Sequence, residues 1–119
     1  MSFDLAVWEG SQPESSSEAT ERFEELYDRY IEQQMETPSP TMVRFVKALT
    51  ATYPDLADLP DDQVDESPWS DGPLLGNASG PFFYFGMSFS RVEEVVPFVA
   101  ETARAHGLVC FDPQSGEML

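Results

Sequence analysis

The chain has 119 residues, of which 22 are Asp or Glu and six are Lys or Arg, so its formal net charge at pH 7 is −16. This length is the size of one domain, and a hydrophobic content of 41% can build one buried core and argues against disorder. The negative charge repels phosphate backbones and anionic lipid headgroups and attracts cationic partners. We therefore predict a single domain over residues 1–119 that binds neither nucleic acid nor membranes, although acidity for solubility alone would give the same charge.

Cys110 is the only cysteine of the chain, so no internal disulfide can form. It lies in the apolar run LVCF, where a buried and unreactive thiol is the usual state. The start of the chain, MSFDLAVWEG, has neither the basic region nor the long apolar stretch of a secretory signal. No segment reaches the roughly 20 apolar residues of a membrane span. We expect a soluble, cytoplasmic protein.

The run FDLAVWE, residues 3–9, mixes aromatic and β-branched residues and predicts a strand. Its alternate side chains form two faces, with Phe3, Leu5 and Val7 on one and Asp4, Ala6 and Trp8 on the other. Because both faces are mostly apolar, we expect this strand to be covered on much of both sides.

Two amphipathic helices are predicted to follow. Ser15 and Glu18 have the spacing of a capping box at the start of the first helix. The apolar stripe of this helix is formed by Phe23, Leu26, Tyr27, Tyr30 and Ile31. Ser39 can cap the second helix with Pro40 in its first turn, and Pro54 ends it. The second apolar stripe is formed by Met42, Phe45, Val46, Leu49 and Tyr53.

The stretch GPLLGNASGPFFYFGMSF, residues 72–89, predicts a hairpin of a short strand, a Gly/Asn turn and a longer strand. One face of the longer strand is formed by Phe83, Phe85, Met87 and Phe89. Ser90 and Glu93 form a further capping box, which predicts a third helix ending at Gly107. Pro97 lies inside this helix and should bend it or delay its start. The run LVCFD, residues 108–112, predicts a last, buried strand.

The predicted order of elements is β-α-α-β-β-α-β, without an internal repeat or a long linker. This order indicates the α+β class. We predict a small mixed sheet with the helices packed on one face.

Residues 55–71, DLADLPDDQVDESPWSD, contain seven carboxylates and no Lys or Arg. We call this stretch the acidic segment. Three interpretations are open: a metal site, a flexible solvated spacer, or a surface that binds a basic partner.

A metal or catalytic site is poorly supported by the residue pattern. Residues 61–66 spell D-D-x-x-D-E, like the magnesium motif of prenyl-transferring enzymes, but those enzymes carry it on a helix of a much larger all-helical fold. The pattern of a calcium-binding EF-hand loop is also absent. His106 is the only histidine, so one chain cannot build a zinc cluster, and its position suits the negative end of the third helix. We expect no catalytic residue, metal or cofactor.

The acidic segment is therefore interpreted as a surface for a basic protein. Carboxylates speed association with a cationic partner, and a desolvated Trp can anchor it. The predicted partner-binding residues are Asp58, Asp61, Asp62, Asp65, Glu66, Trp69 and Asp71. Trp69 could instead pack against the sheet, and both roles are compatible if its ring is half buried.

Three stretches of the chain, MSFDLAVWEG, SPWSDGPLLGNASGPFFYFGMSFSR and HGLVCFDPQSGEML, resemble a group of small acidic bacterial proteins. These proteins start with M-S-[FY]-D-L-x-[VF] and close with H-G-[LV]-x-x-[FY]-D. They are similar in size and acidity to immunity proteins of bacterial polymorphic toxin systems. The shared motifs are structural, so the resemblance implies a toxin as partner but assigns no functional residue.

These observations lead to one hypothesis and two alternatives. The hypothesis is a non-enzymatic immunity-type protein that binds and neutralises a basic toxin domain in the producing cell. One alternative is a small acidic adaptor or regulatory protein with a housekeeping partner. The other is a metal-dependent enzyme that uses the carboxylates of residues 61–66 with His106.

Overall fold

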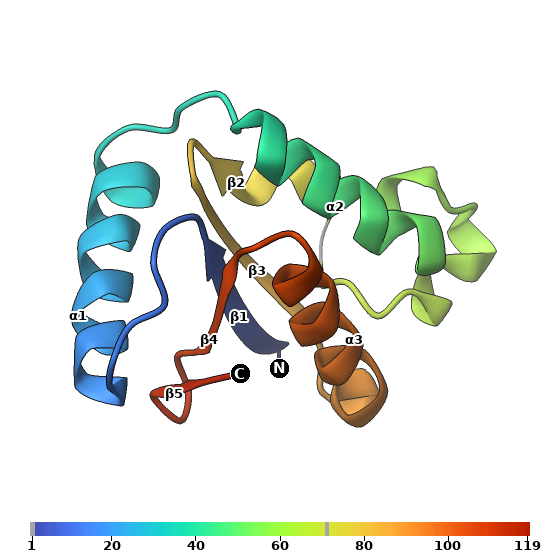
Figure 1. Cartoon of the computed structure of the whole chain (residues 1–119). Helices are drawn as coiled ribbons and strands as arrows, with labels where there is room; N and C mark the ends of the chain where they lie inside the picture. The colour runs from blue at the N-terminus through green and yellow to red at the C-terminus, as the bar shows by residue number, and fades with distance from the viewer. Residues whose placement is uncertain (1, 71) are drawn as a thin grey trace.

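The computed structural model describes residues 2–70 and 72–119, and in this part the chain forms one five-stranded antiparallel sheet. At its centre, β1 (Ser2–Trp8) pairs along its whole length with β3 (Phe82–Ser88) and at its end with β4 (Val109–Asp112). The two edges are formed by the two-residue strands β2 (Ala78–Ser79) and β5 (Glu117–Met118). The order across the sheet is β2-β3-β1-β4-β5 (Figure 1).

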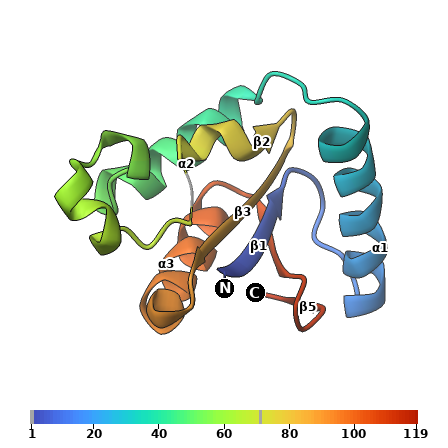
Figure 2. The same cartoon turned by 180° about the vertical axis from the view of Figure 1, so that it is seen from behind.

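Helices cover both faces of this sheet. On one face, α1 (Ser16–Tyr27) continues without a break into the π-helical segment η1 (Asp28–Gln33). On the other face lie α2 (Pro40–Thr52) and α3 (Val92–Ala105). Figures 1 and 2 show α1 standing apart from α2 and α3, with the strands between them.

The alternation of side chains along β1 explains these two layers. Leu5 and Val7 belong to a core with residues of α2 and α3, whereas Ala6 and Trp8 belong to a second core with residues of α1. All four side chains are almost fully buried. The prediction that this strand is covered on both sides is therefore confirmed.

The α+β class and the order β-α-α-β-β-α-β are confirmed, with β5 added after the last predicted strand. Two details of the prediction differ from the structure. The sheet is antiparallel across the described residues rather than mixed, because β3 and β4 both run opposite to β1 between them. The helices pack on both faces rather than one, because a central strand that is apolar on both faces leaves two faces to bury.

The predicted starts of α1 and α2 are confirmed by their caps. Ser15 accepts a hydrogen bond from the N–H of Glu18 at 3.1 Å. Ser39 accepts one from the N–H of Met42 at 3.1 Å. Each hydroxyl satisfies an N–H that the helix itself leaves without a partner, which fixes where the helix begins.

The start of α3 differs from its prediction. Ser90 lies in the 3-10 turn η5 (Phe89–Arg91), and α3 begins at Val92 without a side-chain cap. The turn also ends the alternation of β3, because the strand stops at Ser88. Phe89, predicted on the same face as Phe83, Phe85 and Met87, therefore lies outside the strand and has 55% of its surface exposed.

Candidate partner-binding groove

The acidic segment connects the end of α2 with the edge of β3 and projects beyond the sheet (Figure 1). It contains two 3-10 helices, η2 (Leu56–Asp58) and η3 (Asp61–Glu66). Five of the predicted partner-binding carboxylates are exposed to solvent: Asp58, Asp61, Asp62, Asp65 and Glu66. Within residues 2–70 and 72–119 none of these five forms an ion pair. The sixth, Asp71, lies outside the described residues.

Asp55 connects the beginning of the acidic segment to the residues that follow it. One carboxylate oxygen accepts a hydrogen bond from the N–H of Ala57 at 3.0 Å, and the other accepts one from the N–H of Leu74 at 2.8 Å. Gly72 allows this approach, because a Cβ at that position would come within 2.7 Å of the Asp55 carboxylate. Asp55 thus has a structural role and differs from the exposed carboxylates that follow it.

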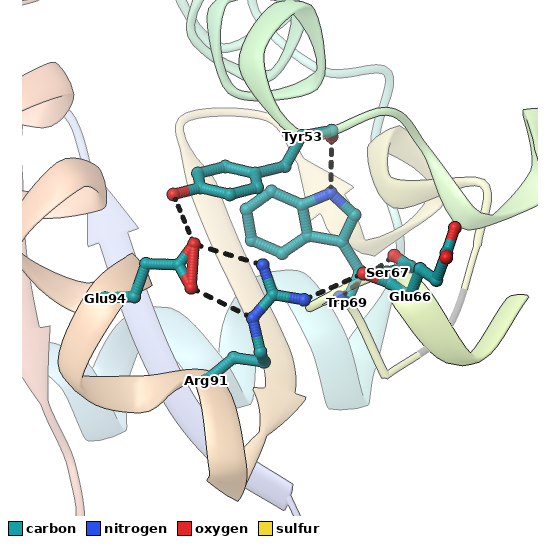
Figure 3. A network of polar contacts seen from close by, with 6 residues as sticks. All are labelled: Tyr53, Glu66, Ser67, Trp69, Arg91 and Glu94. Atoms are coloured by element: carbon teal, nitrogen blue, oxygen red, sulfur yellow. Dashed lines mark hydrogen bonds and ion pairs between the residues drawn. The ribbon is translucent and has the colours of Figure 1, made fainter. Parts of the chain in front are cut away.

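Arg91 fastens the far end of η3 to the start of α3 (Figure 3). Its guanidinium donates to the backbone oxygen of Glu66 at 2.8 Å and makes two hydrogen bonds of 3.1 Å to the carboxylate of Glu94. The hydroxyl of Tyr53 donates to the same carboxylate at 3.1 Å. Hydrogen bonds from Arg91 and then from Tyr53 lower the pKa of Glu94. The guanidinium beside the acidic segment therefore has its own partners and leaves the exposed carboxylates uncompensated.

Trp69 packs in the core. Only 2% of its surface is exposed, its indole N–H donates to the backbone oxygen of Tyr53 at 2.8 Å, and its ring packs edge-on against Phe85. A bridge to Met87 of β3 holds its backbone in place. The prediction of Trp69 as an anchor for a partner is corrected: a ring buried by its own fold has little area left to bury against another protein.

A groove of about 710 Å³ opens where η3 faces the end of β3. Its apolar lining is formed by Leu56, Val64, Trp69 and Phe89, and its polar lining by Asp65, Ser67, Ser70, Ser88 and Ser90. The groove thus combines an exposed aromatic ring, hydroxyl groups and a carboxylate at one place. The remaining carboxylates of η3 adjoin Asp65 in the chain.

Sequence reasoning missed the apolar part of this groove. Leu56 and Val64 sit among the carboxylates of the acidic segment without a periodic pattern, so nothing marked them as a lining. Phe89 continues the alternation of apolar residues in β3, which predicts that it shares a face with Phe83, Phe85 and Met87. The next residue, Ser90, could have indicated that the strand ends before Phe89, because Ser is common in turns as well as at helix starts.

The described residues do not bring His106 and the acidic segment together into a metal centre. Among residues 2–70 and 72–119, no group of three or more His, Cys, Asp or Glu side chains could hold a metal ion. The ring of His106 packs on Phe45, and its Nδ1 lies 2.9 Å from the backbone oxygen of Thr102, which can only accept a hydrogen bond. The described part of the chain therefore offers no assembled site for the metal-dependent alternative.

No protein family, curated protein sequence or solved structure significantly matches this chain. Within the described residues, no helix has both the length and the apolar character needed to cross a membrane.

Cys110 is expected to be unreactive in the folded protein. Burial, and then the charge of Asp112, raise the pKa of its thiol to about 12. Because the thiolate is the reactive form, iodoacetamide at pH 8 should leave the native protein unmodified and alkylate it fully in urea, as read by mass spectrometry. Rapid alkylation without denaturant would contradict the burial of this thiol.

The same pKa predicts how stability depends on pH. An unfolded Cys has a pKa of about 8.5, so between this value and about 12 the folded state keeps a proton that the unfolded state loses. The contribution of Cys110 to the free energy of unfolding is therefore complete below about pH 8.5 and falls as the pH rises towards 12. A Cys110→Ala variant should lose this part of the alkaline decrease.

Proposed function

We propose that this chain is a non-enzymatic immunity-type protein that binds a basic toxin domain and neutralises it by covering its working surface. One observation carries the proposal: the groove is lined by both the exposed ring of Phe89 and the carboxylate of Asp65, and η3, which carries Asp65, has three further exposed carboxylates without an ion-pair partner in the described residues. Protein interfaces commonly combine a desolvated aromatic centre with a charged rim.

The two parts of the groove would act at different stages of binding. The carboxylates and the net charge of −16 attract a cationic partner over a distance and raise the association rate. The apolar lining and the serine hydroxyls act after contact, when water is displaced and short-range contacts slow dissociation. Neutralisation by coverage requires no catalytic group in this chain.

The direct test is co-expression with the toxin domain expected from the neighbouring gene, which should encode a large secreted protein with a variable C-terminal domain. That domain alone should stop growth, and co-expression with this chain should restore growth and yield a complex that co-purifies. If the chain neither restores growth nor co-purifies, the proposal is wrong.

An adaptor with a housekeeping partner would use the same acidic groove. Immobilised protein incubated with a lysate that lacks toxin genes separates the two functions. The immunity-type proposal predicts that no protein is retained through the groove in such a lysate. A stoichiometric partner whose retention is lost when Phe89 is replaced would favour the adaptor.

The carboxylates of η3 are predicted to control the association rate. The variant with amides at Asp61, Asp62, Asp65 and Glu66 nearly keeps the shape of the groove and removes four negative charges. Association with the toxin domain at low salt should be slowed about tenfold and become less sensitive to salt, because the long-range attraction is weaker. Stopped-flow or surface plasmon resonance measurements over a range of salt concentrations would show this.

A matched control separates local charge from net charge. Amides at four exposed glutamates outside the acidic segment change the net charge by the same amount, from −16 to −12: Glu14, Glu21, Glu101 and Glu117. This control should associate distinctly faster than the η3 variant. Equal rates for the two variants would assign the effect to the overall charge and remove η3 from the binding surface.

Phe89 is predicted to control dissociation. Its ring is 55% exposed and contacts Phe3 edge-on, so Phe89→Ser should change the free energy of unfolding little. An aromatic residue at the centre of an interface commonly contributes about 2 kcal/mol, so the complex should dissociate roughly 30-fold faster. Met35→Ser, which removes another exposed apolar side chain (48% exposed) outside the groove lining, is the control and should leave dissociation unchanged.

A further inference from the structure

A second hollow, of about 350 Å³, lies between α1 and β3 on the other face of the sheet from the groove. Its lining consists of Phe23, Glu24, Tyr27, Asp28, Glu32 and Tyr84. Figure 2 shows the two elements that form it, with β3 at the centre of the molecule and α1 to its right. Its volume is at the lower end of the range of small-ligand pockets, which suits a single side chain.

Three aromatic rings contribute to the lining of this hollow. The rings of Phe23 and Tyr84 lie 5.7 Å apart, and those of Tyr27 and Tyr84 lie 5.2 Å apart at nearly right angles. The hydroxyl of Tyr84 donates to the carboxylate of Asp4 at 3.1 Å, which fixes the ring. All three rings remain partly exposed, so each keeps surface that another group can cover.

Three carboxylates, all from α1 and η1, complete the lining of the hollow: Glu24, Asp28 and Glu32. Asp28 accepts a hydrogen bond from the side chain of Gln33 at 2.6 Å, which sets its position. In the described part of the chain, the carboxylate of Glu32 has no ion-pair partner and no side-chain hydrogen bond. The lining of the hollow, as far as the structure describes it, contains no Lys or Arg. The neighbouring Arg29 stacks 4.9 Å from the centre of the Tyr30 ring, outside this lining.

From this combination we infer that the hollow binds the side chain of an arginine from a protein partner. A guanidinium is planar, stacks on aromatic rings and pairs with carboxylates through two parallel hydrogen bonds. The rings and carboxylates of the hollow offer both kinds of contact and no positive charge that would repel the ligand. A lysine ammonium would satisfy the carboxylates but lacks the planar face for stacking.

The inference concerns a surface separate from the groove and does not require the partner to be a toxin. The test uses a capped Gly-Arg-Gly peptide, titrated into the whole protein and followed by the aromatic NMR signals of Tyr27 and Tyr84. These signals should shift and saturate in the millimolar range. The peptide with citrulline in place of arginine has nearly the same shape without the charge, and it should bind at least fivefold more weakly.

Three variants complete the test. Tyr27→Leu keeps helix propensity and removes one ring, and the double variant Glu24→Gln/Glu32→Gln removes two charges. Each should weaken arginine binding about threefold to tenfold, whereas the η3 amide variant should leave it unchanged. Folding of each variant is checked by its melting temperature.

Three results would overturn the inference. The first is no saturable shift of the Tyr27 and Tyr84 signals up to about 50 mM peptide, which is well above the millimolar range expected for binding. The second is equal binding of the arginine and citrulline peptides. The third is a capped Gly-Lys-Gly peptide that binds as tightly as the arginine peptide, since this would leave charge alone as the cause.

Discussion

Replacement of Trp69 by alanine is expected to lower the free energy of unfolding by about 3–5 kcal/mol, the usual cost of truncating a large buried aromatic side chain. Trp69 is 2% exposed, and its ring packs against Tyr53 and Phe85. The substitution also removes the indole N–H that bonds to the backbone oxygen of Tyr53 at 2.8 Å. That oxygen would lose its partner at the point where α2 passes into the acidic segment.

Urea unfolding followed by far-UV circular dichroism measures this loss without relying on tryptophan fluorescence. Trp69→Phe is the matched variant, because it keeps an aromatic ring and loses only part of the volume and the N–H donor. Its loss of stability should be less than half that of Trp69→Ala. An unchanged urea midpoint for Trp69→Ala would show that the ring does not belong to the core, and Trp69 would again be a candidate anchor for the partner.

Replacement of Asp55 by alanine is expected to cost about 2–3 kcal/mol, because hydrogen bonds to a charged group contribute roughly 1.5–3 kcal/mol each and this site is partly open to water. The two carboxylate oxygens accept from the N–H groups of Ala57 and Leu74. Without these two hydrogen bonds the beginning of the acidic segment is no longer connected to the residues that follow the segment. Its cleavage by a protease in native conditions should therefore become faster than in the wild type.

Asp55→Asn is the control for this prediction. Its amide has one oxygen acceptor where the carboxylate has two, so one of the two hydrogen bonds should remain and the stability loss should be intermediate. Limited proteolysis with mass spectrometry locates the cuts, and thermal unfolding gives the total loss. Cuts that spread over the whole chain would contradict a local role for Asp55.

The parts of the fold that depend on local chemistry could be predicted from the sequence. Ser15 and Ser39 cap their helices because a hydroxyl directly before an apolar stripe satisfies the free N–H groups of the first turn. The two apolar faces of β1 follow from the alternation of its side chains. These signals lie within a few residues of the elements that they specify.

The parts that depend on distant contacts could not be predicted in the same way. α1 lies on the opposite face of the sheet from α2 and α3 because of the path taken by the connecting residues. The apolar stripe of a helix shows that one side of it is buried, but not which face of the sheet it covers. Trp69 is buried because the chain returns along β3 and pairs with Met87, a contact between separate segments. The exposed charge of η3 can be read from the sequence, whereas the apolar lining of the groove exists only once η3 lies opposite the end of β3 and η5.

The short edges of the sheet bear on self-association. β2 and β5 have two residues each, and the end of β3 beyond β2 is covered by residues 68–70, through hydrogen bonds from Ser70 N–H to Gly86 O and from Ser88 N–H to Pro68 O. A long uncovered edge would let one copy add its strand to another, which is a common route to aggregation. Residues 68–70 thus occupy hydrogen-bonding groups of β3 that would otherwise be open to a strand from a second copy of this chain.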